Sequence, residues 1–183
     1  MDSNLNFTKV EFLIVIVSIT YGFCIVDILT NWSRIIRRRT SYWETTLWSV
    51  ILFIAISVLW YNSWDNIKFI ERSSGYFVSS LVPPIGLFVM ISSLFPDHNS
   101  EWNLEEMFRR NRKMFFLMFA LVNVFVLILS NTITDPPAIL NYIRSIWAVA
   151  CVVMYFIDSK VLRTLLGGGL ICWYLYLVVF SGM

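Results

Sequence analysis

Long apolar stretches separated by short polar segments constrain this chain more than any other feature of its sequence. Six such stretches cover residues 10–29, 46–64, 76–95, 114–133, 138–157 and 162–180. A helix needs about 20 apolar residues to cross the hydrocarbon core of a membrane. The chain is 58% hydrophobic and only 14% charged, whereas a typical soluble domain carries about 25% charged residues. The sequence therefore predicts an all-α membrane protein in which residues 1–183 form a single transmembrane domain of six helices.

Basic residues divide the five connecting segments into two classes. Ten of the 14 lysines and arginines lie in the first, third and fifth segments, around residues 34–39, 109–113 and 160–163. Only Lys9, Lys68 and Arg72 lie on the opposite side. Because segments rich in Lys and Arg stay in the cytoplasm, we expect the basic segments to be cytoplasmic and both termini to lie outside. A bacterial inner membrane is the expected location.

The third connecting segment predicts a short interfacial helix before the fourth span. Glu105 and Glu106 each precede an arginine by four residues, the order that stabilises helices. Together with the first segment, this helix offers a basic surface to anionic lipid or to a cytoplasmic protein partner. Its residues are Arg37, Arg38, Arg39, Arg109, Arg110, Arg112 and Lys113. The simpler interpretation is an orientation signal with a solvated face.

Polar residues form a stripe along the first span. Thr20, Cys24, Asp27, Asn31, Arg34 and Arg38 recur at spacings of three and four, which places them on one side of a helix. Ionisable groups facing lipid are costly, so the stripe is expected to face other helices or a water-filled path. Asp27, Asn31 and Arg34 are therefore candidates either for an ion pair that closes the bundle or for the mouth of a pore.

A second stripe follows the fifth span from Arg144, in its outer half, to Asp158 near its inner end. An arginine at this depth needs a partner. Glu11 is the carboxylate expected at similar depth, and Asp135 is a shallower alternative. A Glu11–Arg144 pair would make the first and fifth spans neighbours, either as scaffold or as part of an ion path.

Two spans contain residues that disturb helices. Pro83 and Pro84 remove two backbone donors from the third span and predict a kink or break. Gly167, Gly168 and Gly169 in the sixth span either let the backbone unwind or let a neighbouring helix approach closely. Each disturbed helix is the third of its half of the chain. This arrangement is also found in inverted-repeat transporters, although the two halves show no residue-level repeat.

The sequence carries no pattern typical of an enzyme or of a bound cofactor. It has no H-E-x-x-H, G-x-S-x-G or Gly-rich phosphate motif, and its sole histidine, His98, lies in a connecting segment. We therefore expect no catalytic residues, no metal or other cofactor, and no nucleic-acid partner.

The stretches R-I-I-R-R-R (34–39) and N-R-K-M-F-F (111–116) resemble those of small uncharacterised bacterial multi-pass membrane proteins. The resemblance covers these two stretches and implies no function.

The distribution of polar groups favours a small channel or transporter-like protein that moves an ion or small solute. Because six helices make a thin protomer, we expect a homo-oligomer with a pore between copies. Glu11, Asp27, Asn31, Arg34, Arg144 and Asp158 are the candidate pore or ion-pair residues. The alternative is a membrane-anchored effector or interaction subunit that works with a cytoplasmic partner, for example in bacterial stress or defence signalling.

Overall fold

The described part of the chain is entirely helical. The computed structural model describes residues 9–38, 42–65, 74–95, 103–133 and 138–180, and every regular element among them is an α-helix. In chain order these are α1 (Lys9–Arg38), α2 (Trp43–Asp65), α4 (Ser74–Ser80), α5 (Val82–Leu94), α6 (Leu104–Ile133), α7 (Ala138–Phe156) and α8 (Lys160–Phe180). The predicted all-α class is confirmed.

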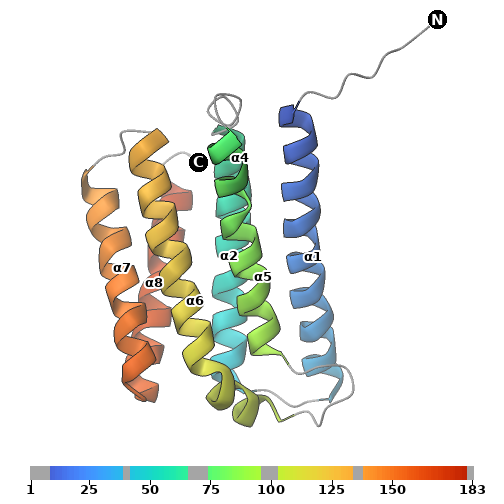
Figure 1. The fold of residues 1–183 in the computed structure, drawn as a ribbon. Helices are drawn as coiled ribbons and strands as arrows, with labels where there is room; N and C mark the ends of the chain where they lie inside the picture. The colour runs from blue at the N-terminus through green and yellow to red at the C-terminus, as the bar shows by residue number, and fades with distance from the viewer. Residues whose placement is uncertain (1–8, 39–41, 66–73, 96–102, 134–137, 181–183) are drawn as a thin grey trace, which may run out of the picture.

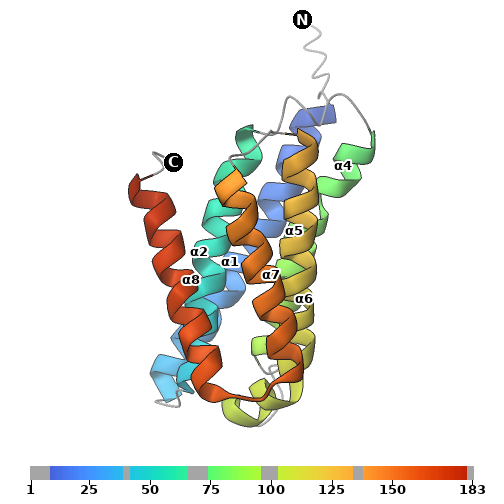
Figure 2. The same ribbon diagram turned by 90° about the vertical axis from the view of Figure 1, so that its left-hand side faces the viewer.

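The long helices run alternately up and down in one bundle (Figure 1). α1 begins and α8 ends at the upper end, while α6 and α8 begin at the lower end (Figures 1 and 2). α6 packs between α5 and α7, and α2 packs against α1, α5 and α8. Most of the basic residues on these helices therefore lie at the lower end of the bundle, which we call the basic end.

Within the described residues, three helices are long and apolar enough, by length and composition, to cross a membrane: Ile14–Arg37, Trp43–Tyr61 and Leu104–Thr132. Two shorter apolar helices cover Val78–Leu94 and Asn141–Phe156. Large apolar side chains on the outer faces are exposed, among them Phe23, Val26, Ile128, Val149 and Leu165. Contact with lipid accounts for so much exposed apolar surface, and the protein is a helical membrane protein. The count of six spans and their orientation stay predictions.

The expected interfacial helix is not a separate element, and this prediction is corrected. α6 continues without a break from Leu104 to Ile133. One buried stripe runs through both predicted parts of it at helical spacing: Leu104, Phe108, Arg112, Phe115, Phe119 and Val122. Because neither proline nor glycine interrupts this stretch, the residues expected on the membrane surface extend the fourth span as its first turns.

The third predicted span is interrupted at Leu81, which separates α4 from α5. Pro83 and Pro84 lie in the first turn of α5, where the missing N–H groups have no helical partner to lose. The break therefore falls just before the prolines, and α5 alone reaches the basic end.

The predicted break at Gly167, Gly168 and Gly169 is wrong, because α8 runs through all three glycines. A Cβ atom placed on Gly167 would lie 2.8 Å from Leu47 Cδ2 of α2. The alternative interpretation, close helix packing, therefore holds at Gly167, where α2 and α8 meet.

An aromatic layer fills the centre of the bundle. Trp48 of α2 is completely buried and meets Phe115, Phe116 and Phe119 of α6 edge-on, with ring centroids 5.1–6.0 Å apart. Edge-to-face contacts of this kind are favourable beyond the apolar area that they bury. We call these four residues the aromatic layer.

Adjacent glycines of α8 allow a test of the α2–α8 contact. Gly167→Leu is expected to destabilise the protein by about 1–3 kcal/mol, because the new side chain overpacks against Leu47. Gly168→Leu is the matched control, since no atom lies within 4 Å of a Cβ placed there. The free energy of unfolding in bicelles compares the two variants. Equal losses at both positions would contradict the assigned packing.

Candidate functional site

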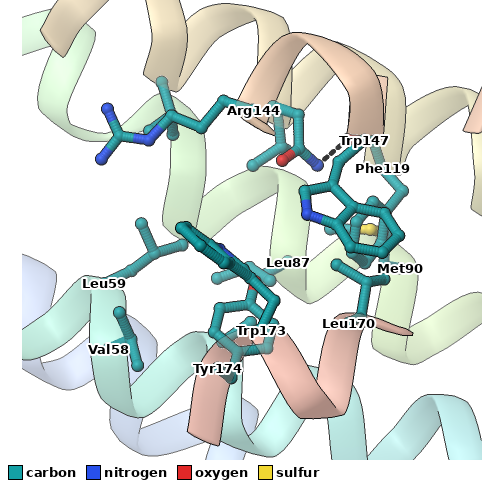
Figure 3. A pocket seen from close by; sticks show the side chains of 14 residues that line it. Val58, Leu59, Leu87, Met90, Phe119, Arg144, Trp147, Leu170, Trp173 and Tyr174 are labelled. Atoms are coloured by element: carbon teal, nitrogen blue, oxygen red, sulfur yellow. Dashed lines mark hydrogen bonds between the residues drawn. The ribbon is translucent and has the colours of Figure 1, made fainter. Parts of the chain in front are cut away.

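A pocket of about 110 Å³ opens between α2, α5, α6, α7 and α8, on the upper side of the aromatic layer. Its walls are largely apolar and aromatic, and Phe119 is shared with the aromatic layer. Figure 3 shows Arg144 along one edge and Trp147, Trp173 and Tyr174 around the interior. We call it the Arg144 pocket. Pockets of this kind, apolar with a few polar groups, are the usual small-molecule sites of proteins.

Arg144 has one partner among the described residues. Its Nη1 donates to the hydroxyl of Ser130 on α6 at 2.6 Å. No described carboxylate lies within ion-pair distance of its guanidinium. A guanidinium has five N–H donors. Most of the N–H groups of Arg144 therefore have no acceptor among the described residues.

The predicted Glu11–Arg144 pair is wrong. α1 packs against α2 and α5, whereas α7 stands at the opposite edge of the bundle, beyond α5 and α6 (Figure 1). The first and fifth predicted spans are therefore not neighbours. The alternative partner, Asp135, lies outside the described residues.

Trp147 reaches the pocket because α8 carries a glycine opposite it. A Cβ atom on Gly169 would lie 2.9 Å from the edge of the Trp147 ring. The indole Nε1 is buried and finds no acceptor among the described residues. In addition to the N–H groups of Arg144, the pocket thus contains a second N–H donor that has no acceptor among the described residues.

A cluster of charged groups lies at the basic end, below the aromatic layer. Glu44, in the first turn of α2, accepts two hydrogen bonds from Arg163 of α8, at 3.1 and 3.2 Å. The two side chains are 0% and 2% exposed. Tyr42 donates its hydroxyl hydrogen to the same carboxylate at 2.9 Å. Two-point contact with further hydrogen bonds is the arrangement that a buried ion pair requires.

Asp158 extends this cluster towards α6. It lies in the turn between α7 and α8 and accepts a hydrogen bond from Arg163 at 2.5 Å. Arg112 of α6 lies 3.1 Å from the same oxygen and donates to the carbonyl of Ile157 at 2.9 Å. The hydrogen bond from Arg163, helped by the charges of Arg112 and Arg163, lowers the pKa of the Asp158 carboxyl. We call Tyr42, Glu44, Arg112, Asp158 and Arg163 the ion-pair cluster.

Buried side chains separate the pocket from the ion-pair cluster. Seven residues of α8 separate Arg163 from the pocket residue Leu170, which is about 10 Å at helical rise. The aromatic layer occupies this interval on α2 and α6. Aromatic side chains and then paired charges therefore lie between the pocket and the basic end.

The polar stripe of the first span does not line the Arg144 pocket. Asn31 is buried and donates to the side chain and the backbone carbonyl of Asp27, both at 2.9 Å. Arg34 is half-buried one turn further on. Because α1 contacts α2 and α5, this stripe follows the edge of the bundle and does not reach the Arg144 pocket.

The predicted basic surface divides into two parts. Arg37, Arg109, Arg110 and Lys113 are exposed, and Arg109 pairs with Glu105 at 2.8 Å, as their spacing predicts. Arg112 is only 7% exposed. Its assignment to a partner or lipid surface is corrected, because its side chain turns inward to Asp158. Arg39 and the side chain of Arg38 lie outside the described residues.

Three members of the ion-pair cluster, Tyr42, Glu44 and Arg163, are not among the site residues that the sequence predicts. Arg163 appears there only as part of the orientation signal. The missed signal is depth: Glu44 and Arg163 each lie in the first turns of a span that starts at the basic end, so they stand at the same level. The depth argument that linked Glu11 with Arg144 applies more strongly to this pair.

Comparison with known proteins gives no relative. No protein-family model, no curated protein and no solved structure matches this chain. Within the described residues, no group of three metal-ligating side chains is present.

Neutralising Glu44 tests the ion-pair cluster. Glu44→Gln leaves the Arg163 guanidinium buried beside a neutral amide and is expected to cost about 3–5 kcal/mol of unfolding free energy. Glu105→Gln is the control, because Glu105 and its partner Arg109 are both exposed, at 46% and 60%, and an exposed pair contributes less than about 1 kcal/mol. Unfolding in bicelles measures both. A loss at Glu105 as large as that at Glu44 would contradict the assignment.

Tyr42 gives the cluster a spectroscopic signature. Burial, with the hydrogen bond to Glu44, raises the pKa of the Tyr42 hydroxyl to about 12, above the value of about 10 for a free tyrosine. Its contribution to stability is therefore complete below about pH 10 and is lost as the pH rises through about 12. Titration of tyrosinate absorbance in the wild type and in Tyr42→Phe should differ by one group ionising near pH 12. A difference curve centred near pH 10 would show that this hydroxyl is not held by the cluster.

Proposed function

We propose that the protein is a transporter-like membrane protein that moves a small solute through the Arg144 pocket. The observation that carries the proposal is a pocket inside the bundle whose cation, Arg144, donates to a single hydroxyl among the described residues, with the aromatic layer on its lower side. Transporters bind their solutes near the middle of the membrane and open to one side at a time. A pocket bounded below by the aromatic layer and the ion-pair cluster is what the state closed to the basic end requires.

The route of entry follows from the same geometry. The solute reaches the pocket from the upper end, where α1 begins and α8 ends. Passage to the other side then requires the aromatic layer to part and the Glu44–Arg163 pair to separate. Charged pairs that form in one state and break in another supply the two discrete arrangements that a switching protein needs.

The site lies within one chain, so this route needs no second copy. The predicted homo-oligomer and its pore between protomers remain a separate expectation. With the positive-inside rule applied to the basic end, the pocket in this state faces the outside of the cell.

Flux through proteoliposomes tests the proposal. Three slowly permeating probes cover the charge classes: erythritol, choline and benzenesulfonate. Wild-type protein is expected to accelerate the flux of at least one of them. Ala55→Phe places a ring in the pocket from α2 and should reduce this flux at least tenfold.

Two controls make the result specific. Ser57→Phe adds the same ring to the exposed face of α2 and should leave the flux unchanged. Asp27→Asn should also leave it unchanged, because α1 does not line the pocket. Absence of protein-dependent flux for every probe would contradict the proposal and favour the membrane-anchored interaction subunit. Flux that survives Ala55→Phe would place the route elsewhere.

A further inference from the structure

Three arginines of α6, α7 and α8 are buried or half-buried, and one of them differs from the other two in its partners. Arg163 meets Glu44 and Asp158, and Arg112 meets Asp158. Arg144 meets only a neutral hydroxyl among the described residues. A cation inside a membrane bundle is costly unless it is paired or faces water. Arg144 is therefore the position where an anion brought by a ligand gains most.

The donors of the pocket suit an anionic head group. Arg144 has further N–H groups beyond the one used on Ser130. Trp147 adds a buried Nε1–H without an acceptor among the described residues, and Figure 3 shows this nitrogen on the side of the ring that faces the pocket. Hydrogen bonds from charged donors to an anion are about twice as strong as those between neutral groups.

The remaining walls suit a flat apolar body of limited size. Trp173, Tyr174, Phe119 and Met90 line the space below Arg144. The volume is about 110 Å³, which is of the same order as the ~150 Å³ cavity that accepts benzene. A larger solute, of the kind that fills pockets of ~300–1,000 Å³, does not fit inside in this state.

We propose that the Arg144 pocket binds a small amphipathic anion, with its anionic head at Arg144 and one ring-sized apolar group among Trp147, Trp173 and Tyr174. The inference deepens the proposed function by naming the class of solute. An aromatic acid with a single ring has this chemistry.

Binding to protein in nanodiscs of phosphatidylcholine tests this directly, through quenching of tryptophan fluorescence. Benzenesulfonate and benzenesulfonamide are matched in size and differ in charge. Saturable binding of the anion, at least tenfold tighter than that of the neutral amide, is expected. Equal affinities, or no saturation by benzenesulfonate, would overturn the proposal.

Variants locate the head group. Arg144→Gln should weaken benzenesulfonate binding at least tenfold, whereas Arg110→Gln, which removes an exposed arginine of α6, should not change it. Trp147→Phe keeps the ring, removes Nε1–H and should weaken the anion about threefold while leaving the neutral amide unchanged. This second variant keeps the test open if Arg144→Gln does not fold. Anion affinity that is unchanged in both Arg144→Gln and Trp147→Phe would overturn the proposal.

Asp135 supplies a further test of the charge balance. If its carboxylate already neutralised Arg144, Asp135→Asn would raise benzenesulfonate affinity strongly, and the wild type would not bind the anion better than the amide. That outcome would overturn the proposal, and an unchanged affinity supports it.

The proposed anion site and the proposed transport can be rejected independently of each other. Anion binding in nanodiscs without flux in vesicles would reject the proposed transport and leave the anion site standing. Flux of erythritol or choline that Ala55→Phe blocks, without anion binding, would leave the transport route and reject the anion.

Discussion

A charge held away from water must be neutralised, and this constraint organises the bundle from its basic end. The Glu44–Arg163 pair joins the first turns of α2 and α8, and both side chains are almost completely buried. Because removing either partner strands the other, the pair fixes how these two helices meet. Asp158 and Arg112 then tie the α7–α8 turn to α6, so that most of the bundle is held at one level.

The same constraint applies to the cation of the Arg144 pocket. The aromatic layer keeps the ion-pair cluster and the pocket apart, so the carboxylates of the cluster cannot serve Arg144. Arg163 and Arg112 lie against carboxylates, whereas Arg144 contacts only a hydroxyl among the described residues. Arg144 is therefore the cation that can accept an anionic partner from outside the protein. The structure thus combines a buried ion-pair cluster at one end of the bundle with a pocket lined by Arg144 on the other side of the aromatic layer.

The sequence was sufficient to predict the helices but insufficient to predict which helices pack against one another. Apolar stretches and the repeated spacing of basic segments predicted the all-α class and the gathering of charge at one end. The face of α7 that carries Arg144 also carries Ala148 and Cys151, which are buried. Helical periodicity says which face is buried, but it does not say which helix covers that face. The partner of Arg163 lies 119 residues away, and the order of helices that brings it there is a property of tertiary packing. For this reason Glu11 was assigned to Arg144, although α5 and α6 stand between their helices.

Side-specific labelling of the pocket tests most directly whether it is open to the upper end alone. Val126→Cys lines the pocket from α6, and Val124→Cys on the same helix is exposed on the outer face; both are made in a chain without Cys24, Cys151 and Cys172. A membrane-impermeant thiol reagent is expected to modify Val126→Cys from the side where α1 begins and not from the basic end, and to modify Val124→Cys slowly from either side. Equal labelling of Val126→Cys from both sides, or labelling from the basic end alone, would contradict a pocket closed by the aromatic layer and the ion-pair cluster.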